Sequence, residues 1–204
     1  MNAEFVFVDE VVRGVRWDAK YATWDNFTGR PVDGYLVNRI AATREMCAAL
    51  IEARDRAAGM GLGLLLWDGY RPQRATDQFL RWSEQEEDGV RKARHYPRLE
   101  RADLFELGYI HGRSGHTRGA AVDLTLFELD GGALLDMGGR HDLMDPSSHH
   151  AAAGLSREER SHRRLLRTVM ELSGFSAYER EWWHYALTNE PHPDSYFDGE
   201  IVGA

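Results

Sequence analysis

Residues 114–124 read Ser114-Gly115-His116-Thr117-Arg118-Gly119-Ala120-Ala121-Val122-Asp123-Leu124. The stretch contains a histidine and an aspartate, both common zinc ligands, seven residues apart. A fully extended chain would separate His116 from Asp123 by roughly 23 Å, whereas the ligands of one zinc ion lie roughly 2.0–2.2 Å from it. The chain must therefore fold back between them, and Gly119 is the residue best able to permit this. We expect a strand to follow over residues 121–126.

A second cluster, Glu181-Trp182-Trp183-His184, lies far downstream. On a helix Glu181 and His184 would share a face, whereas on a plain strand they would point to opposite sides. The bulky aromatic residues favour a strand over residues 182–187. We therefore expect Glu181 at the entrance of the strand or on a bulge, leaning over a metal ion rather than binding it.

These residues together predict metal-assisted hydrolysis of an amide. Three protein ligands, His116, Asp123 and His184, leave a fourth zinc position open for water. Glu181 would take a proton from that water and later deliver it to the leaving amine. Arg71 would supply a fixed positive charge for the developing oxyanion. A His–Asp pair alone is usually without function, so the prediction depends on the whole set.

Six of the seven other histidines are interpreted as surface or hydrogen-bonded residues rather than ligands. They are His111, His141, His149, His150, His162 and His192.

Hydrophobic periodicity and capping signals predict several helices and strands. A helix is expected from Asn38 to about residue 58, followed by a buried strand over residues 62–67. A second helix should begin at Pro72 and reach about residue 87, which places Arg71 where a strand ends and a helix begins. Ser156 and the glutamate three residues later form a capping-box pattern, and this helix should reach about residue 173.

The segment 20–35 is rich in aromatic and turn residues and is expected to be an ordered loop. Its Tyr21 and Tyr35 leave two interpretations open. Their rings could line a pocket, or they could cap the core.

The bulk composition bounds the class of protein. With 204 residues and 43% hydrophobic content, the chain suits one domain over residues 1–204. The balance of 25 basic against 33 acidic residues argues against nucleic-acid binding and gives no reason to expect binding to a membrane. Cys47 is the only cysteine, which excludes an intrachain disulfide. The N-terminus has no signal-peptide pattern, so we expect a cytoplasmic protein.

The two clusters resemble those of the zinc metallopeptidases that cut D-alanyl-D-alanine bonds. The shared pattern is Ser114-x-His116-x-x-Gly119-x-Ala121-x-Asp123 followed by Glu181-x-x-His184. Stretches that look like the dipeptidases of this family span nearly the whole chain. They are residues 21–29, Trp67-Asp68-Gly69-Tyr70-Arg71-Pro72, residues 114–124, Asp136-Met137-Gly138, residues 148–150 and residues 181–184.

The resemblance implies a fold and a set of roles. The fold would be α+β, a single domain with a central, mostly antiparallel sheet flanked by helices, as in murein endopeptidases and the hedgehog signalling domain. One zinc ion per chain would be bound by His116, Asp123 and His184, with Glu181 as base and Arg71 acting in the transition state.

The resemblance also implies the substrate contacts. Asp142 would meet the amino terminus of the substrate, although the preceding Gly139-Arg140-His141 departs from the Thr-Pro-Phe usual there. Ser114 would lie near the substrate carboxylate. The pocket walls would be formed by Tyr21, Tyr35, Phe79 and Trp182.

The activity implied is hydrolysis of free D-alanyl-D-alanine, a small dipeptide, in the cytoplasm, which contributes to vancomycin resistance. Two alternatives stay open: a D,D-carboxypeptidase that acts on pentapeptide precursors, and a non-enzymatic zinc-binding domain. The sequence also leaves the oligomeric state open, a homodimer included.

Overall fold

The computed structural model describes residues 4–87 and 89–203. The strands are β1 (Phe5–Phe7), β2 (Arg16–Trp17), β3 (Ala41–Thr43), β4 (Leu62–Asp68), β5 (Ala121–Glu128), β6 (Phe175–Ala177) and β7 (His184–Leu187). The α-helices are α1 (Val8–Val11), α2 (Arg44–Ala58), α3 (Gln73–Ser83), α4 (Lys92–His95), α5 (Asp103–Glu106) and α6 (Arg157–Glu171). Three short 3-10 helices complete the set: η1 (Lys20–Ala22), η2 (His116–Arg118) and η3 (Pro146–Ser148).

The main sheet has five strands in the order β2-β4-β5-β7-β6. β2 pairs with β4 in parallel, and the other three neighbouring pairs are antiparallel. Strands β1 and β3 form a separate antiparallel pair. Seven of the eight residues of the central strand β5 are buried, because the sheet is covered on both faces at this position. The expected mostly antiparallel sheet is confirmed.

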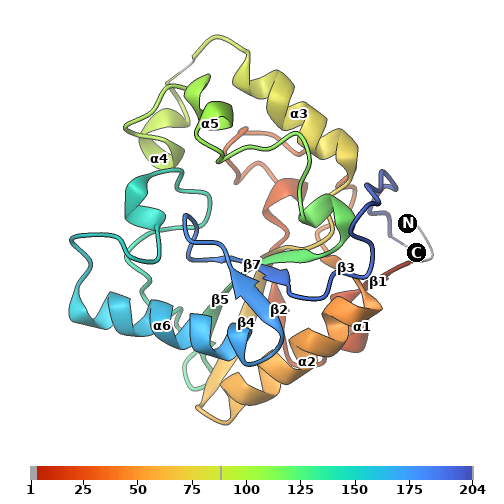
Figure 1. Cartoon of the computed structure of the whole chain (residues 1–204), viewed down its shortest axis with the longest axis vertical. Helices are drawn as coiled ribbons and strands as arrows, with labels where there is room; N and C mark the ends of the chain where they lie inside the picture. Colours follow the sequence, from red (N-terminus) through yellow and green to blue (C-terminus); the bar gives the residue numbers. More distant parts are fainter. Residues whose placement is uncertain (1–3, 88, 204) are drawn as a thin grey trace.

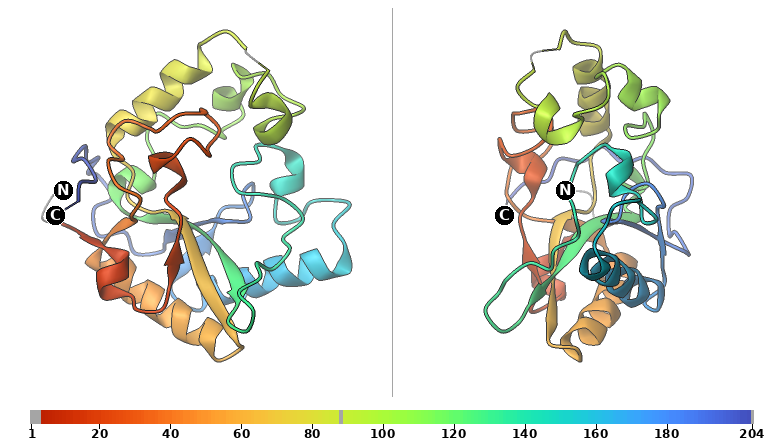
Figure 2. Two further views of the ribbon diagram at one scale, coloured as in Figure 1. Left: turned by 180° about the vertical axis from the view of Figure 1, so that it is seen from behind. Right: turned by 90° about the vertical axis from the view of Figure 1, so that its left-hand side faces the viewer.

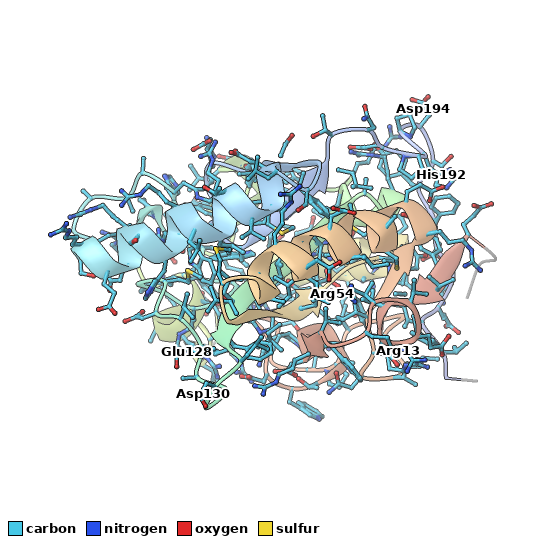
Figure 3. All side chains as sticks on the ribbon, turned by 90° about the horizontal axis from the view of Figure 1, so that it is seen from below. Arg13, Arg54, Glu128, Asp130, His192 and Asp194 are labelled. Carbon is cyan, nitrogen blue, oxygen red and sulfur yellow. The ribbon has the colours of Figure 1, made fainter. Side chains whose placement is uncertain are left out.

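Helices α2 and α6 cover one face of the sheet and run side by side (Figures 1 and 3). Their apolar faces, which include Leu50 of α2 and Leu166 of α6, pack with Leu64 and Leu124 of the sheet into the larger hydrophobic core. Cys47 is buried in this core.

Helices α3, α4 and α5 lie on the other side of the molecule, together with the segment 20–35 (Figures 1 and 2). A second core, rich in aromatic side chains, joins these parts. Phe79 of α3 lies at its centre, with ring centroids 5.1 Å from Tyr21 and 4.7 Å from Phe27. The molecule is thus a mixed α+β fold, as expected.

The helix predicted from Asn38 begins later. Strand β3 comes first, and Thr43 caps α2, because its Oγ1 accepts a hydrogen bond from the Met46 N–H at 3.2 Å. The Oδ1 of Asn38 instead accepts the Ala19 N–H at 2.8 Å, which holds a loop and leaves no free cap. The side chain of Asn38, which the local pattern suggested as a helix cap, therefore binds the backbone of a distant segment instead.

The other helix starts are confirmed, but the helices are shorter. α3 begins directly after Pro72 and ends at Ser83 rather than near residue 87. α6 carries the expected capping box at Ser156 and ends at Glu171 rather than near residue 173. The strand predicted over residues 62–67 is β4, which continues to Asp68.

The strand predicted over residues 182–187 begins only at His184. Trp182 and Trp183 form a turn, in which the His184 N–H donates to the Glu181 carbonyl at 3.2 Å. Both indole side chains are buried in the larger core. Burial in a turn therefore accounts for these aromatic residues, which the sequence pattern assigned to a strand.

Candidate metal centre

The chain folds back between His116 and Asp123 through the left-handed residue Gly119. Gly119 has φ 70° at the end of η2, and its N–H donates to the His116 carbonyl at 2.9 Å. A Cβ at this position would lie 2.6 Å from Cε1 of Phe5 and 2.8 Å from Cγ2 of Thr43. Both the backbone angle and the close contacts therefore require glycine, and the predicted reversal is confirmed.

The other two members of the cluster are cross-strand partners. Asp123 in β5 stands directly opposite His184 in β7. Directly opposed residues project to the same face of a sheet, so their side chains meet. His184 Nδ1 lies 3.1 Å from Asp123 Oδ1 and 3.1 Å from His116 Nε2, and His116 Nε2 lies 3.4 Å from Asp123 Oδ1. The structure thus brings together all three predicted ligands.

The donor set fits a zinc ion. One ligand atom from each of His116, Asp123 and His184 lies within 4.8 Å of the others. His116 Nδ1 donates to the Gly69 carbonyl at 2.7 Å, which turns its Nε2 toward the cluster. Burial alone would raise the pKa of Asp123, but His116 foremost among its neighbours holds that pKa well below the usual value. An ionised carboxylate and two imidazole nitrogens therefore converge on one point, and these are donor types that zinc accepts.

Glu181 lies beside the three ligands without joining them. Its Oε2 is 3.8 Å from His184 Nδ1. Burial, and then the carboxylates of Asp123 and Asp142, raise the pKa of Glu181 to about 8. A carboxyl group with a pKa near neutrality can both accept and return a proton, as a general acid–base residue must.

Arg71 follows β4 and lies between two aspartates. Its Nε and Nη2 are 3.0 Å and 2.8 Å from Asp68 Oδ2, and its Nη2 is 3.8 Å from Asp123 Oδ2. Burial alone would lower the pKa of Arg71, but the Asp68 carboxylate foremost outweighs it, so the pKa lies well above the usual value. The backbone N–H of Arg71 also donates to the His116 carbonyl at 3.2 Å. A permanent positive charge is thus fixed next to the cluster.

A cavity of about 140 Å³ opens onto these groups. Besides the three ligands, its lining includes five of the other predicted site residues and Phe79. Those five are Tyr21, Arg71, Ser114, Asp142 and Glu181.

Tyr35 and Trp182, both in the described part of the chain, are not among the residues that line this cavity. The Tyr35 hydroxyl donates to Asp68 Oδ1 at 2.7 Å, so Tyr35 supports the partner of Arg71 from behind. Trp182 borders a second cavity of about 690 Å³. Of the two interpretations of the aromatic loop, the first applies to Tyr21, whose ring lines the cavity. The second applies to Tyr35, whose ring is buried in the core.

Asp142 stands in a constrained conformation at the cavity wall. Its φ of 57° is the only positive value among the non-glycine residues of the described ranges, and such values cluster at functional sites. Its carboxylate accepts the Tyr21 hydroxyl at 3.0 and 3.1 Å, and its carbonyl accepts His95 Nδ1 at 3.0 Å. Ser114 is held differently, since its Oγ accepts the His116 N–H at 3.2 Å.

Sequence reasoning missed two residues of the site. Asp68 ends strand β4 and is the main partner of Arg71, a role that a carboxylate three residues before an arginine could have suggested. His141 is buried, and its Nε2 lies 3.3 Å from Asp123 Oδ2. The prediction that His141 is a hydrogen-bonded histidine is correct. The one sequence signal that connects it with the site is its position directly before Asp142.

The chain is similar in sequence to known proteins along almost its whole length. A sequence profile described as "D-ala-D-ala dipeptidase" matches residues 1–201. The chain belongs to this family. The "D-alanyl-D-alanine dipeptidase" of Streptomyces coelicolor is 64% identical over 202 residues, which cover 99% of this chain and 100% of the relative. The protein of the same name from Enterococcus faecium is 56% identical over 198 residues, with 97% and 98% covered.

Among solved structures, the LdcB LD-carboxypeptidase aligns with 93% of this chain and 70% of its own, at 16% identity and a TM-score of 0.47. Because this structural similarity is low, the family assignment depends on the sequence matches alone. Within the described ranges, no helix combines the length and the apolar character that a membrane span requires.

Proposed function

We propose that this member of the dipeptidase family is a zinc-dependent enzyme, formed by one domain over the whole chain, that hydrolyses free D-alanyl-D-alanine to D-alanine. The observation that carries the proposal is the pairing of the three converging ligands with Glu181 in one cavity of about 140 Å³. Ordinary ligand pockets measure roughly 300–1,000 Å³, so this cavity suits a small substrate.

One zinc ion per chain would be held by His116, Asp123 and His184. Bound there, zinc supplies a Lewis acid that polarises the scissile carbonyl and lowers the pKa of a water molecule. The remaining chemistry falls to the side chains around the cavity.

Glu181 is the proposed general base and acid. Its carboxylate takes the proton of the attacking water and then delivers it to the nitrogen of the leaving D-alanine. This role is supported by its position beside the three ligands, 3.8 Å from His184 Nδ1. A general acid–base residue of this kind contributes roughly 10²–10⁴-fold to the rate.

Arg71 is the proposed partner of the oxyanion. Its guanidinium stays charged and is held by Asp68 at 2.8 Å, so little reorganisation is needed as negative charge develops on the substrate. The fork geometry of the side chain also fixes the direction in which its N–H groups point.

Asp142 and Ser114 would hold the two ends of the dipeptide. The Asp142 carboxylate would bind the free amine, and the region of Ser114 would face the carboxylate. Tyr21 and Phe79 would form the walls, and the Tyr21 hydroxyl keeps the Asp142 carboxylate in place with contacts of 3.0 and 3.1 Å.

A D,D-carboxypeptidase that trims pentapeptide precursors is the second candidate. A carboxylate positioned to bind a free amine disfavours it, because a longer peptide has an amide there. Side-by-side cleavage of D-alanyl-D-alanine and a pentapeptide that ends in the same two residues tests the choice. The dipeptide should be cleaved with the higher kcat/KM, and a preference for the pentapeptide would overturn the proposal.

A non-enzymatic zinc-binding domain fits less well. A structural zinc site normally has four protein ligands, and it would need neither a base such as Glu181 nor a charged Arg71.

In its cellular setting, an enzyme with this substrate would act in the cytoplasm. By removing D-alanyl-D-alanine it would contribute to vancomycin resistance.

A further inference from the structure

The imidazole of His141 meets the predicted metal ligand Asp123 on the side away from the metal site. His141 Nε2 lies 3.3 Å from Asp123 Oδ2 and 3.5 Å from Asp142 Oδ1. Both neighbours are carboxylate oxygens, which only accept hydrogen bonds. His141 Nε2 must therefore carry a proton and donate it.

The two oxygens of Asp123 have different surroundings. Oδ1 faces the other two ligands, at 3.4 Å from His116 Nε2 and 3.1 Å from His184 Nδ1. Oδ2 faces His141 at 3.3 Å and Arg71 Nη2 at 3.8 Å. Of these two donors, only His141 is within hydrogen-bonding distance of Oδ2.

The ring of His141 is held rigidly. It stacks on Trp67 with a centroid separation of 4.8 Å and an interplanar angle of 30°, and it meets Trp183 edge-on at 5.5 Å. The side chain is buried, so it cannot turn toward water. A donor fixed by packing can in turn fix the acceptor that it contacts.

We propose that His141 is a positioning residue whose Nε2–H keeps Asp123 a one-oxygen metal ligand. Occupied by this hydrogen bond, Oδ2 stays turned away from the metal site, and one coordination position remains open for substrate. Without it, the carboxylate can rotate and offer both oxygens. The inference rests on the proposed zinc site, and it assigns a role to a residue outside the set of ligands, base and oxyanion partner.

Three substitutions test this. His141→Phe keeps an aromatic ring against Trp67 and removes the donor. His141→Gln keeps an amide N–H near the position of Nε2. His141→Leu is a second donor-free variant, for use if the Phe variant does not fold. The matched control is His150→Phe, because His150 is a mostly buried histidine whose ring packs against Tyr185 at 6.1 Å, away from the cluster.

The first measurement is the zinc dissociation constant in competition with a chromophoric chelator. Loss of a hydrogen bond to a metal ligand typically costs 10–100-fold in affinity. We expect the donor-free variants to bind zinc about 10-fold more weakly or worse, while His141→Gln and His150→Phe stay close to the parent.

The second measurement is the visible spectrum of the cobalt(II)-substituted protein, whose band intensity falls as the coordination number rises. His141→Phe should show weaker bands than the parent, and His141→Gln should restore them. Parental affinity and spectrum in the donor-free variants would overturn the proposal, and so would equal losses in the Phe and Gln variants. If the parent binds zinc but does not cleave D-alanyl-D-alanine, the proposed function fails, whereas these two measurements still decide the role of His141.

Discussion

Asp123 and His184 lie directly opposite each other in the antiparallel pair β5–β7, and their side chains meet at 3.1 Å. They lie 61 positions apart along the chain. The site therefore exists only when β7 pairs with β5 in this register, because a shift by one residue would turn His184 to the opposite face of the sheet. His116 reaches the same point through the reversal at Gly119.

Gly119→Ala should lower the free energy of unfolding. Its positive φ of 70° alone costs an alanine roughly 1–2 kcal/mol, and its Cβ would also overlap Phe5 and Thr43. Gly61→Ala is the matched control, because Gly61 has φ 75° but no atom within 4 Å of such a Cβ. Urea denaturation should show a larger loss for Gly119→Ala, and equal losses would mean that the close contacts carry no cost.

Glu181→Gln should retain zinc but lose hydrolysis. The amide keeps the shape of the side chain but cannot accept the proton of water, so kcat should fall by roughly 10²–10⁴-fold. Metal analysis and steady-state kinetics on D-alanyl-D-alanine check both parts. A variant with the activity of the parent would remove Glu181 from the mechanism.

Arg71→Lys should mainly lower kcat. Lysine keeps a charge for the buried Asp68 but loses the two-pronged contact that aims N–H groups at the substrate, and loss of an oxyanion donor costs roughly 10²–10³-fold. Arg74→Lys is the control, since Arg74 pairs with Asp198 at the surface. An unchanged kcat in Arg71→Lys, measured at saturating substrate, would contradict the oxyanion role.

The residues of the site could be predicted more completely than their surroundings. His116, Asp123, Glu181 and His184 lie in two short motifs, and the reversal at Gly119 follows from distance alone. The partners of these residues depend on contacts between distant segments. Nothing local indicates that Tyr35 turns its hydroxyl to Asp68, or that His141 contacts Asp123.

The secondary structure shows the same division. The capping box at Ser156 is satisfied within one turn of helix, so the sequence pattern was sufficient to predict it. Asn38 looked like a cap as well, but its side chain binds the backbone of Ala19. The sequence pattern assigned the two tryptophans before His184 to a strand. They lie before the strand begins, and their side chains are buried in the core.

Stability should fall in mild acid through His150. Burial foremost lowers the pKa of this histidine from 6.5 to about 4 in the folded protein. Between these values the unfolded chain binds the proton and the folded chain does not, so the contribution of neutral His150 is complete above pH 6.5 and is lost as the pH falls toward 4.

The measurement is the urea midpoint at pH 7 and pH 5 for the parent and for His150→Phe. The parent should lose more stability between the two pH values, because phenylalanine does not titrate. Identical losses would show that His150 is not buried in its neutral form.

The most direct test of the central claim is hydrolysis of free D-alanyl-D-alanine by the purified protein before and after removal of metal. The parent protein should release D-alanine, a chelator should abolish the activity, and zinc should restore it in proportion to binding, with full activity at one ion per chain. Hydrolysis that persists after complete removal of metal, or no hydrolysis by the zinc-loaded protein, would contradict the account.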